Sequence, residues 1–343
     1  MLDISNEEVL RQYLLDKGHM KAGEHCWIKY CGGGVSGTVA FVHVDGREMI
    51  VKQALAKLKV KEEWLCDPNR MQIEMKSNEI YHRFVPENTP EVYFYDHDNY
   101  IFGREAAPEE AIMWKSDLMT GRLDFVVAEK VMRSLCIVHN ECAKDREIAE
   151  FFADKAIFYE LRISPYIKFI LNKHPQLTDY AQPIIEELMD SAITLVHGDY
   201  SPKNVMINDR KVYLMDFEVA HYGHPSFDLG FLSNHLVLKS IYNCKYGAAY
   251  LSMLRHILDL YFNEMDYMDK GALEQSFIKL LPLLMIARVD GKSPVEYLTE
   301  PVDKELVRTI AYAIIESKPA DRHVMIDLIL AHVEAYFENT KNA

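Results

Sequence analysis

The chain has 343 residues, of which 49% are hydrophobic and 26% charged, a composition typical of a folded protein long enough for two domains. Lys and Arg number 38 against 52 Asp and Glu, so the net charge is −14. Because affinity for a phosphate backbone needs a basic face, this balance argues against nucleic acid as a partner. The longest apolar run, 280–287, is too short to span a bilayer, and no secretory signal is visible. We therefore expect a cytoplasmic protein with no membrane partner, whose six cysteines are reduced.

The first third of the chain has the alternation of a sheet. Strand-like runs at 38–44 and 48–54 flank the Asp-Gly pair 45–46, a strong hairpin signal. A helical spacing of apolar residues follows over 69–85, and 89–106 predicts two further strands. This part of the chain is therefore expected to be a small, strand-rich domain.

After about residue 108 the pattern becomes helical, apart from one strand-like island at 193–221. The expected helical segments are 125–142, 145–172, 181–192, 226–240, 246–264, 272–287 and 303–337. We therefore predict an α+β fold with a strand-rich N-terminal lobe, 1–107, and a larger, mainly helical C-terminal lobe, 108–343.

Oxygen-bearing side chains converge at one end of a predicted hairpin inside the island. Asn204 comes just before its first strand and Asp216 just after its second, with Asp199 upstream and Glu218 two residues further on. Carboxylate and amide oxygens are the ligands that Mg²⁺ prefers. The Asp-x4-Asn spacing is also that of kinases, in which the Asp accepts the hydroxyl proton and the Asn holds a metal ion.

A glycine-rich stretch and a lysine supply a phosphate-binding pattern in the first lobe. Backbone amides can approach phosphate oxygens closely where no Cβ intervenes, and the candidates here are Gly32, Gly33, Gly34 and Ser36. Lys52 falls late in the second strand, where a kinase lysine reaches the phosphates of ATP. Glu74 lies 22 residues later on the predicted helix and could pair with Lys52, although Glu79 competes for that role.

Each of these residues has an ordinary alternative, because a lone Lys52 is commonly a solvated strand residue and a glycine run is commonly only a loop. Their joint order along the chain favours the functional interpretation.

The stretches VHGDYSPKNVMIN and VYLMDFEVAHYGHPSFDLGFL resemble the aminoglycoside phosphotransferase and choline kinase superfamily, which has a protein-kinase-like bilobal fold. The segments VKQALAKLKVKEEW and NRMQIEM in the first lobe are similar to methylthioribose kinase. The resemblance implies an enzyme that transfers the γ-phosphate of ATP, with Mg²⁺, to a hydroxyl of a small molecule such as a sugar, amino alcohol or aminoglycoside.

The resemblance also implies roles for individual residues. Lys52, oriented by Glu74, would hold the ATP phosphates, and Asp199 would be the catalytic base. Asn204 and Asp216 would hold Mg²⁺ with Glu218 nearby. The remaining implied roles are adenine contacts from the backbone around Glu105 and Ala107, acceptor contacts from Tyr200, Ser201, Tyr222 and Arg288, and structural roles for His197 and Asp228.

The pattern departs from methylthioribose kinases in three places. The stretch Asp216-Phe217-Glu218-Val219 stands where those enzymes usually have Asp-Pro-Glu-Phe. Asn204 stands where those enzymes usually have Ser, and a single Arg288 stands where they have an arginine pair. The acceptor therefore stays open between methylthioribose and other hydroxylated molecules.

Two other functions and a dimer are also considered. A protein of the same fold could bind nucleotide without turnover. A metal-dependent hydrolase could use His221, His224 and His235, although no acid at suitable spacing completes a zinc site. The helical segment 303–337 is a candidate face for a homodimer.

Overall fold

The protein is described from a computed structural model in which residues 2–32, 37–54 and 70–341 are described. The chain separates into two compact units: residues 1–110 with 215–218, and residues 111–214 with 219–343. Each unit is described by itself. The mixed α+β class and the division into a strand-rich and a helical part confirm the predicted fold class.

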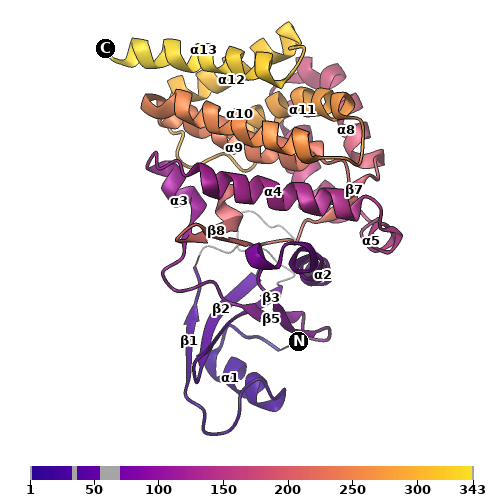
Figure 1. Ribbon diagram of the computed structural model, residues 1–343, viewed down its shortest axis with the longest axis vertical. Coiled ribbons are helices and arrows are strands. Elements are labelled where there is room, and N and C mark those ends of the chain that lie inside the picture. Colours follow the sequence, from indigo (N-terminus) through magenta and orange to yellow (C-terminus); the bar gives the residue numbers. More distant parts are fainter. Residues whose placement is uncertain (1, 33–36, 55–69, 342–343) are drawn as a thin grey trace. The chain divides into compact units, whose positions relative to one another are not determined.

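The first unit is built on a five-stranded antiparallel sheet with strand order β1-β2-β3-β5-β4 (Figure 1). The strands are β1 Cys26–Tyr30, β2 Gly37–Val44, β3 Arg47–Ala54, β4 Val92–Asp96 and β5 Ile101–Glu105. The unit also contains helix α1 Glu7–Asp16, helix α2 Arg70–Phe84 and the 3₁₀ turn η1 Pro86–Asn88. The predicted hairpin is confirmed, because Asp45 and Gly46 both have positive φ, 39° and 82°, as a tight two-residue turn requires.

Helix α1 covers one face of this sheet. Its Leu10 and Leu14 are fully buried and share a hydrophobic cluster with Val42 of β2 and Val51 of β3. Asn6 caps the helix by accepting hydrogen bonds from the N–H groups of Glu8 and Val9. The alternation of buried and partly exposed residues along β2 is the pattern of a strand with one face in the core.

The second unit is mainly helical. Its helices are α3 Trp114–Met119, α4 Phe125–Cys142, α5 Arg146–Phe151, α6 Ala156–Phe158, α7 Phe169–Leu171, α8 Thr178–Asp190, α9 Ser226–Tyr242, α10 Gly247–Glu264, α11 Lys270–Asp290, α12 Pro301–Ser317 and α13 Arg322–Lys341. Shorter elements are the π-helix η2 Tyr159–Lys168 and the 3₁₀ turns η3 Pro175–Leu177, η4 Pro202–Asn204 and η5 Cys244–Tyr246. The strands are β6 Ile112–Met113, β7 Thr194–Val196, β8 Val205–Asn208, β9 Lys211–Leu214 and β10 His221–Gly223.

Helix α9 is the centre of this unit. It is buried along nearly its whole length, and it packs against α10, α11 and α12 (Figure 1). A helix that is buried on every side has neighbours on every side, and the polar residues of α9 are therefore enclosed together with its apolar ones. Its first turn therefore has a fixed position from which to hold a loop.

Two of the predicted helical segments are divided in the structure. The segment 303–337 forms α12 and α13, because Lys318 adopts a left-handed conformation, φ 49°, that ends α12. The segment 145–172 is interrupted after α5 and continues as the π-helix η2, which contains Pro165. A proline has no N–H to donate and therefore disturbs regular helix hydrogen bonding.

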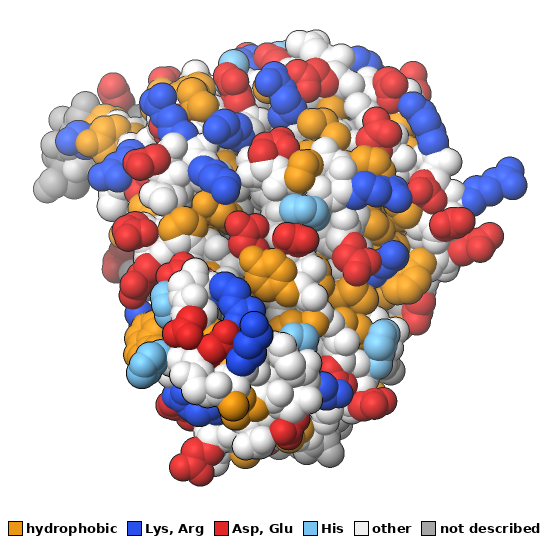
Figure 2. Space-filling view, turned by 60° about the horizontal axis from the view of Figure 1, so that its bottom comes forward, with side chains coloured by type: hydrophobic (Ala, Val, Ile, Leu, Met, Phe, Trp, Pro, Cys, Tyr) orange, Lys and Arg blue, Asp and Glu red, His pale blue; other side chains and the backbone are white. Residues whose placement is uncertain are grey.

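Acidic and basic side chains of the described residues lie intermixed on the face shown in Figure 2. No helix within the described ranges is long and apolar enough to cross a membrane. The five described cysteines are free thiols.

Candidate active site

The first unit contains a buried ion-pair cluster around Lys52. Its Nζ lies 2.7 Å from Glu74 Oε2 and 3.0 Å from Asp216 Oδ1. Glu79 instead lies 3.2 Å from Lys76 on the same helix. The structure therefore joins Lys52 with Glu74, and not with Glu79, among the alternatives left open by the sequence.

Close strand pairing fixes the position of Lys52. Gly37 of β2 pairs with Ala54 of β3, and a Cβ on Gly37 would lie only 2.6 Å from the Gln53 carbonyl oxygen. Glycine at this position therefore lets the two strands meet beside Lys52. The predicted phosphate-loop residue Gly32 is described and exposed, whereas Gly33, Gly34 and Ser36 lie outside the described residues.

This cluster contains further charged residues. Arg70, which is 1% exposed, donates from Nε to Glu218 Oε2 at 3.2 Å. The buried Arg104 guanidinium interacts electrostatically with Glu74 and Asp216, so three cations lie among three carboxylates. Burial raises the pKa of Glu74 to about 7 against the lowering effect of Lys52. Burial lowers the pKa of Lys52, but Asp216 and Glu74 outweigh it and raise the pKa overall.

The donor set of the cluster suits a divalent cation. One carboxylate oxygen from each of Glu74, Asp216 and Glu218 lies within 4.8 Å of the others, and hard oxygen ligands suit Mg²⁺. Lys52 and Arg70 already offset part of this charge. Asp216 also has φ 66°, a left-handed conformation that costs a non-glycine residue energy, and such strain is often found at functional sites.

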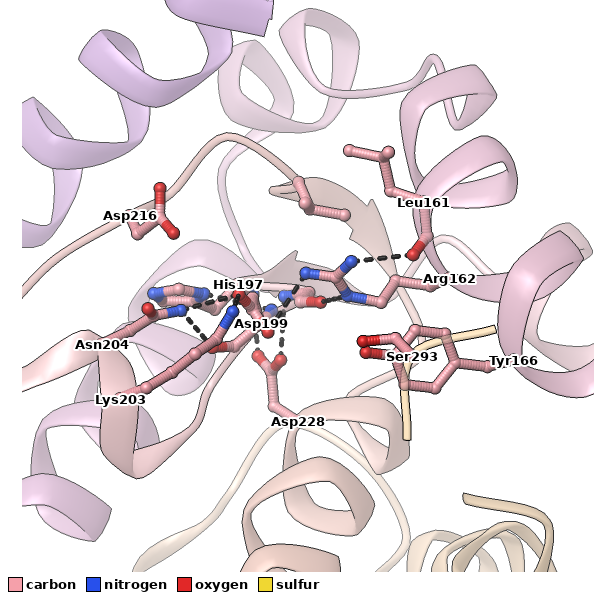
Figure 3. A network of polar contacts seen from close by, with 12 residues as sticks. Leu161, Arg162, Tyr166, His197, Asp199, Lys203, Asn204, Asp216, Asp228 and Ser293 are labelled. Atoms are coloured by element: carbon pink, nitrogen blue, oxygen red, sulfur yellow. Dashed lines mark hydrogen bonds and ion pairs between the residues drawn. The ribbon is translucent and has the colours of Figure 1, made fainter. Parts of the chain in front are cut away.

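The second unit fixes the loop from His197 to Asn204 through one buried carboxylate. Asp228, in the first turn of α9, accepts the His197 N–H at 2.7 Å and the Gly198 N–H at 2.9 Å (Figure 3). His139 of α4 adds an Nε2 contact to Asp228 at 3.3 Å. Asp228 therefore has the structural position that the resemblance implied, as a carboxylate that holds backbone amides of the loop.

Gly198 is required by the shape of this loop. Its φ is 75°, and a Cβ there would lie 2.5 Å from the Val219 carbonyl oxygen. The His197 side chain accepts the Asp199 N–H through Nδ1 at 3.2 Å and meets the Tyr200 ring edge-on at 5.4 Å. The backbone on both sides of Asp199 is therefore held in place.

Asp199 is 3% exposed and both of its carboxylate oxygens have cationic or amide neighbours. Oδ1 lies 3.1 Å from Arg162 Nη2, and Oδ2 lies 2.9 Å from Lys203 Nζ. Asn204 donates from Nδ2 to Oδ2 at 2.8 Å. Figure 3 shows Arg162 on one side of Asp199 and Lys203 with Asn204 on the other.

The side-chain amide oxygen of Asn204 is available to a ligand. Its Nδ2 donates both to the Asp199 side chain and to the Asp199 carbonyl, at 2.8 Å and 2.9 Å. Its Oδ1 accepts no hydrogen bond from any residue in the described ranges. The amide oxygen is thus the atom of Asn204 that a metal ion could use.

Arg162 was missed by the sequence analysis. It lies on η2 and donates from Nε to the Gly198 carbonyl at 2.6 Å while its Nη2 meets Asp199. π-Helices are often found at functional sites, but the sequence ELRISPYIK has no motif that marks one. The nearest signal was Pro165, which interrupts an otherwise helical pattern.

The four predicted acceptor residues have different surroundings. The Tyr200 hydroxyl donates to the Val131 carbonyl, and the Tyr222 hydroxyl donates to the carbonyls of Cys142 and Ala143 at 3.2 Å. The polar atoms of these two tyrosines are therefore engaged inside the unit.

The other two acceptor candidates keep polar atoms available. Ser201 Oγ is buried and has no hydrogen-bond partner among the described residues. Arg288 of α11 donates from Nη1 to the Tyr166 hydroxyl at 3.1 Å, while its buried Nε has no partner in the same described set.

The predicted adenine contacts lie at the end of β5. The Glu105 N–H donates to the Glu91 carbonyl at 2.8 Å, and Arg104 Nη1 donates to the Glu105 carbonyl at 3.1 Å. The backbone of Ala107 makes no hydrogen bond with the described residues. Ala107 therefore keeps the backbone groups that a base could use.

The three histidines considered for zinc each have contacts inside the unit. His235 meets the Phe231 ring edge-on at 5.5 Å. His221 stacks on Phe158 at 3.9 Å, and burial lowers its pKa to about 4. His224 Nδ1 contacts the Ser226 hydroxyl at 2.8 Å. Within the described ranges, no group of potential metal ligands contains His221, His224 or His235.

The two-unit α+β fold and the Asp199 loop define the class of protein to which this chain is similar. Residues 139–258, which include Asp199, Asn204 and Asp228, match the family model described as phosphotransferase enzyme family. This match confirms the resemblance predicted from the motifs.

Among curated proteins, methylthioribose kinase 2 from Oryza sativa subsp. japonica is 22% identical over 239 residues, which are 62% of this chain and 56% of that protein. Methylthioribose kinase from Bacillus cereus strain G9842 is 24% identical over 259 residues, 67% of this chain and 65% of that protein. The chain thus spans between about half and two thirds of the length of these relatives.

Among solved structures, the amicoumacin kinase hAmiN in complex with AMP-PNP, Ca²⁺ and Ami superposes with a TM-score of 0.51. Its sequence is 12% identical, and the match covers 92% of this chain and 98% of that chain. This likeness supports the fold.

Proposed function

We propose that the protein is a phosphotransferase that moves the γ-phosphate of ATP to a hydroxyl of a small molecule. The observation that carries the proposal is the Asp199 loop, in which a buried carboxylate has fixed neighbours on each oxygen and its backbone is held by Asp228. A base must be held in one orientation to meet an acceptor hydroxyl. The match of residues 139–258 to the phosphotransferase family supports the same reaction.

In this mechanism Asp199 orients the acceptor hydroxyl and accepts its proton as the new O–P bond forms. Lys52, protonated beside Glu74 and Asp216, contacts the negatively charged phosphates of ATP. Ala107 supplies backbone contacts to adenine, together with the chain around Glu105. These residues position and stabilise charge, which is most of what phosphoryl transfer requires from a protein.

Asn204 and Asp216 are the residues that we propose to hold Mg²⁺, because the Asn204 amide oxygen accepts no hydrogen bond from the described residues and the Asp216 side chain is 30% exposed. When bound, Mg²⁺ would neutralise charge on the phosphates of ATP. Glu218 is a less direct candidate than the sequence implied, because Arg70 already contacts its carboxylate.

Methylthioribose kinase activity is the more specific candidate. It is supported by the 22–24% identity to enzymes of that name. Arg288, near the end of α11, is the arginine that would contact the sugar. The difference at Asn204, where those enzymes usually have Ser, is the reason to test other acceptors beside methylthioribose.

The test is formation of phosphorylated product from ATP and Mg²⁺ with single acceptors, detected by mass and by release of ADP. Methylthioribose, choline and an aminoglycoside represent the acceptors of similar proteins. We expect one class of acceptor to give ADP and product in equal amounts. Binding of nucleotide without transfer to any hydroxylated acceptor would instead support the non-catalytic alternative.

A further inference from the structure

One face of helix α9 leads away from the Asp199 loop and carries two basic residues. Asp228, Phe231, His235 and Lys239 follow one another at spacings of three, four and four residues, which places them on one side of an α-helix. Asp228 at the start of this face holds the loop. At about 1.5 Å per residue, Lys239 lies roughly 16 Å further along the axis.

Arginines line the near end of this face. The Arg162 guanidinium lies 5.5 Å from the Phe231 ring centre and 5.8 Å from that of Tyr166. Arg288 lies 5.6 Å from the same Tyr166 ring and donates to its hydroxyl. Burial would raise the pKa of Tyr166, but Arg288 and Arg162 outweigh it and lower the pKa, so Tyr166 lies in a positive electrostatic environment.

Lys239 forms the far end and is 1% exposed. Its Nζ makes one long contact with the His235 carbonyl, at 3.5 Å, and lies 5.1 Å from the Tyr297 ring centre. No carboxylate of the described residues forms an ion pair with it. Glu296, the acid that favours its charged form, is itself paired with Lys115.

Polar atoms without partners lie along the same stretch. Arg288 Nε and the Tyr297 hydroxyl are both buried and have no hydrogen bond to the described residues. A buried cation or donor without a partner destabilises a protein. An anion bound in this part of the unit would supply the missing hydrogen-bond partners.

We propose that the acceptor is a hydroxylated anion, whose carboxylate or phosphate group is bound by Arg288 and Lys239 while its hydroxyl lies at Asp199. The proposal rests on the phosphotransferase function and names an acid, in place of the uncharged methylthioribose, as the substrate class. It separates this protein from enzymes for cationic acceptors, because a quaternary ammonium or aminoglycoside group would face Arg162, Arg288 and Lys239. The positive side chains supply both attraction for the anion and rejection of the cation.

The experiment measures binding of three compounds with one carbon skeleton, by calorimetry on the full chain without nucleotide. It is run below pH 7, where Lys239, whose pKa burial lowers to about 7, is charged. Glycerol is neutral, glycerate carries a carboxylate, and glycerol 3-phosphate carries a phosphate. The six-carbon set of glucitol, gluconate and glucitol 6-phosphate repeats the comparison with a longer reach. We expect at least one acid of a set to bind roughly tenfold or more tightly than its neutral parent.

Single substitutions test which residues cause the tighter binding of the acid. Lys239→Met and Arg288→Gln should each remove most of the preference for the acid, and Lys239→Met removes a buried charge without creating a cavity. Lys245→Met is the matched control, because Lys245 lies over the Tyr246 ring at 5.2 Å, much as Lys239 lies over Tyr297, but is exposed. It should leave the preference unchanged.

The outcomes separate the two proposals. Equal binding of acids and neutral parents in both sets, or a preference that survives both Lys239→Met and Arg288→Gln, would overturn the anionic acceptor. If one of these two results is found and phosphate is nevertheless transferred to a neutral or cationic acceptor, the phosphotransferase function is supported and only the anionic acceptor is wrong. Binding of the acids that depends on both residues, with no phosphate transfer, would support the anion site and contradict the enzyme.

Discussion

The two charged clusters of the molecule are centred on opposite charges. In the first unit, the cation Lys52 lies between the carboxylates of Glu74 and Asp216. The buried cations Arg70 and Arg104 and the carboxylate of Glu218 lie around them. In the second unit, the carboxylate of Asp199 lies between the cations Arg162 and Lys203, and further basic residues follow along α9. Buried charges are stable only when they are compensated. Under the proposed function, Mg²⁺ would bind at the carboxylates of the first cluster and an acidic acceptor beside the second.

The clusters also differ in how their central residue is held. The backbone of Lys52 lies in a paired strand, and ion pairs from residues far apart in the sequence hold its side-chain nitrogen. Asp199 is fixed mainly through its backbone, because Asp228 holds the preceding amides and Gly198 permits the turn. Substitutions should therefore affect the two clusters differently.

The largest effect is expected from Asp199→Asn. The amide keeps the shape of the side chain but cannot accept the acceptor's proton, so kcat should fall by about 10²–10⁴-fold. Affinity for ATP should stay close to that of the wild type, since the Lys52 cluster is unchanged. Product formation and nucleotide binding, measured on the same preparation, check this expectation; a variant with full kcat would exclude Asp199 as the base.

Gly198→Ala tests whether the backbone holds the second cluster. The backbone at Gly198 has a positive φ, and the Cβ that the substitution adds would lie 2.5 Å from the Val219 carbonyl oxygen. We expect a loss of about 1–2 kcal/mol from the backbone conformation and about 1–3 kcal/mol more from the steric conflict. Gly23→Ala is the control, because Gly23 has φ 89° with open space around it. Equal losses in urea unfolding would show that the conflict at Gly198 is relieved.

Glu74→Gln tests whether ion pairs hold the first cluster. It removes a buried charge-assisted contact to Lys52, and we expect a loss of about 1–3 kcal/mol in unfolding free energy and a raised KM for ATP. Glu79→Gln is the same substitution on the same helix, but it breaks only an exposed pair with Lys76, which should cost under about 1 kcal/mol. A KM for ATP that rises equally in both variants would contradict a specific role for Glu74.

Lys239 gives the smallest effect, a dependence of stability on pH. Burial, followed by Lys115 and Arg288, lowers its pKa from 10.5 to about 7 in the folded protein. Between about pH 7 and pH 10 the unfolded chain therefore binds more protons, so the unfolding free energy should rise with pH by on the order of 1 kcal/mol per pH unit. The charged and titratable groups around Lys239 are Lys115 of α3, His235 of α9, Arg288 of α11, and Glu296 and Tyr297 of the following loop.

Lys239→Met should lack this rise, whereas Lys245→Met should keep it. Urea unfolding of the three proteins across this range measures it. If the stability of the wild type and of Lys239→Met changes in parallel, Lys239 does not titrate as its burial implies.

The sequence by itself determined the local elements and the chemical types at the site. The hairpin at 45–46, helix α4 and the hairpin of β8 and β9 follow from turn residues and periodicity, which act over a few neighbouring residues. The spacing of Asp199 and Asn204 likewise lies within one loop and could be read directly. The sequence could not decide which acid forms the ion pair with Lys52. Glu74 and Glu79 lie on one helix, and only the rotation of that helix about its axis determines which of them faces Lys52.

Only the tertiary structure shows that Arg162 and Arg70 belong to the two charged clusters and that further basic residues lie along α9. Arg162 and Asp199 are separated by 36 intervening residues, and Arg70 and Glu218 by 147, so no local pattern connects them. Lys239 lies within the predicted helical segment 226–240, and only the packing of other helices around α9 shows that its side chain is buried. Whether a charge is compensated depends on what the folded chain packs around it, which is a property of the fold and not of any single segment.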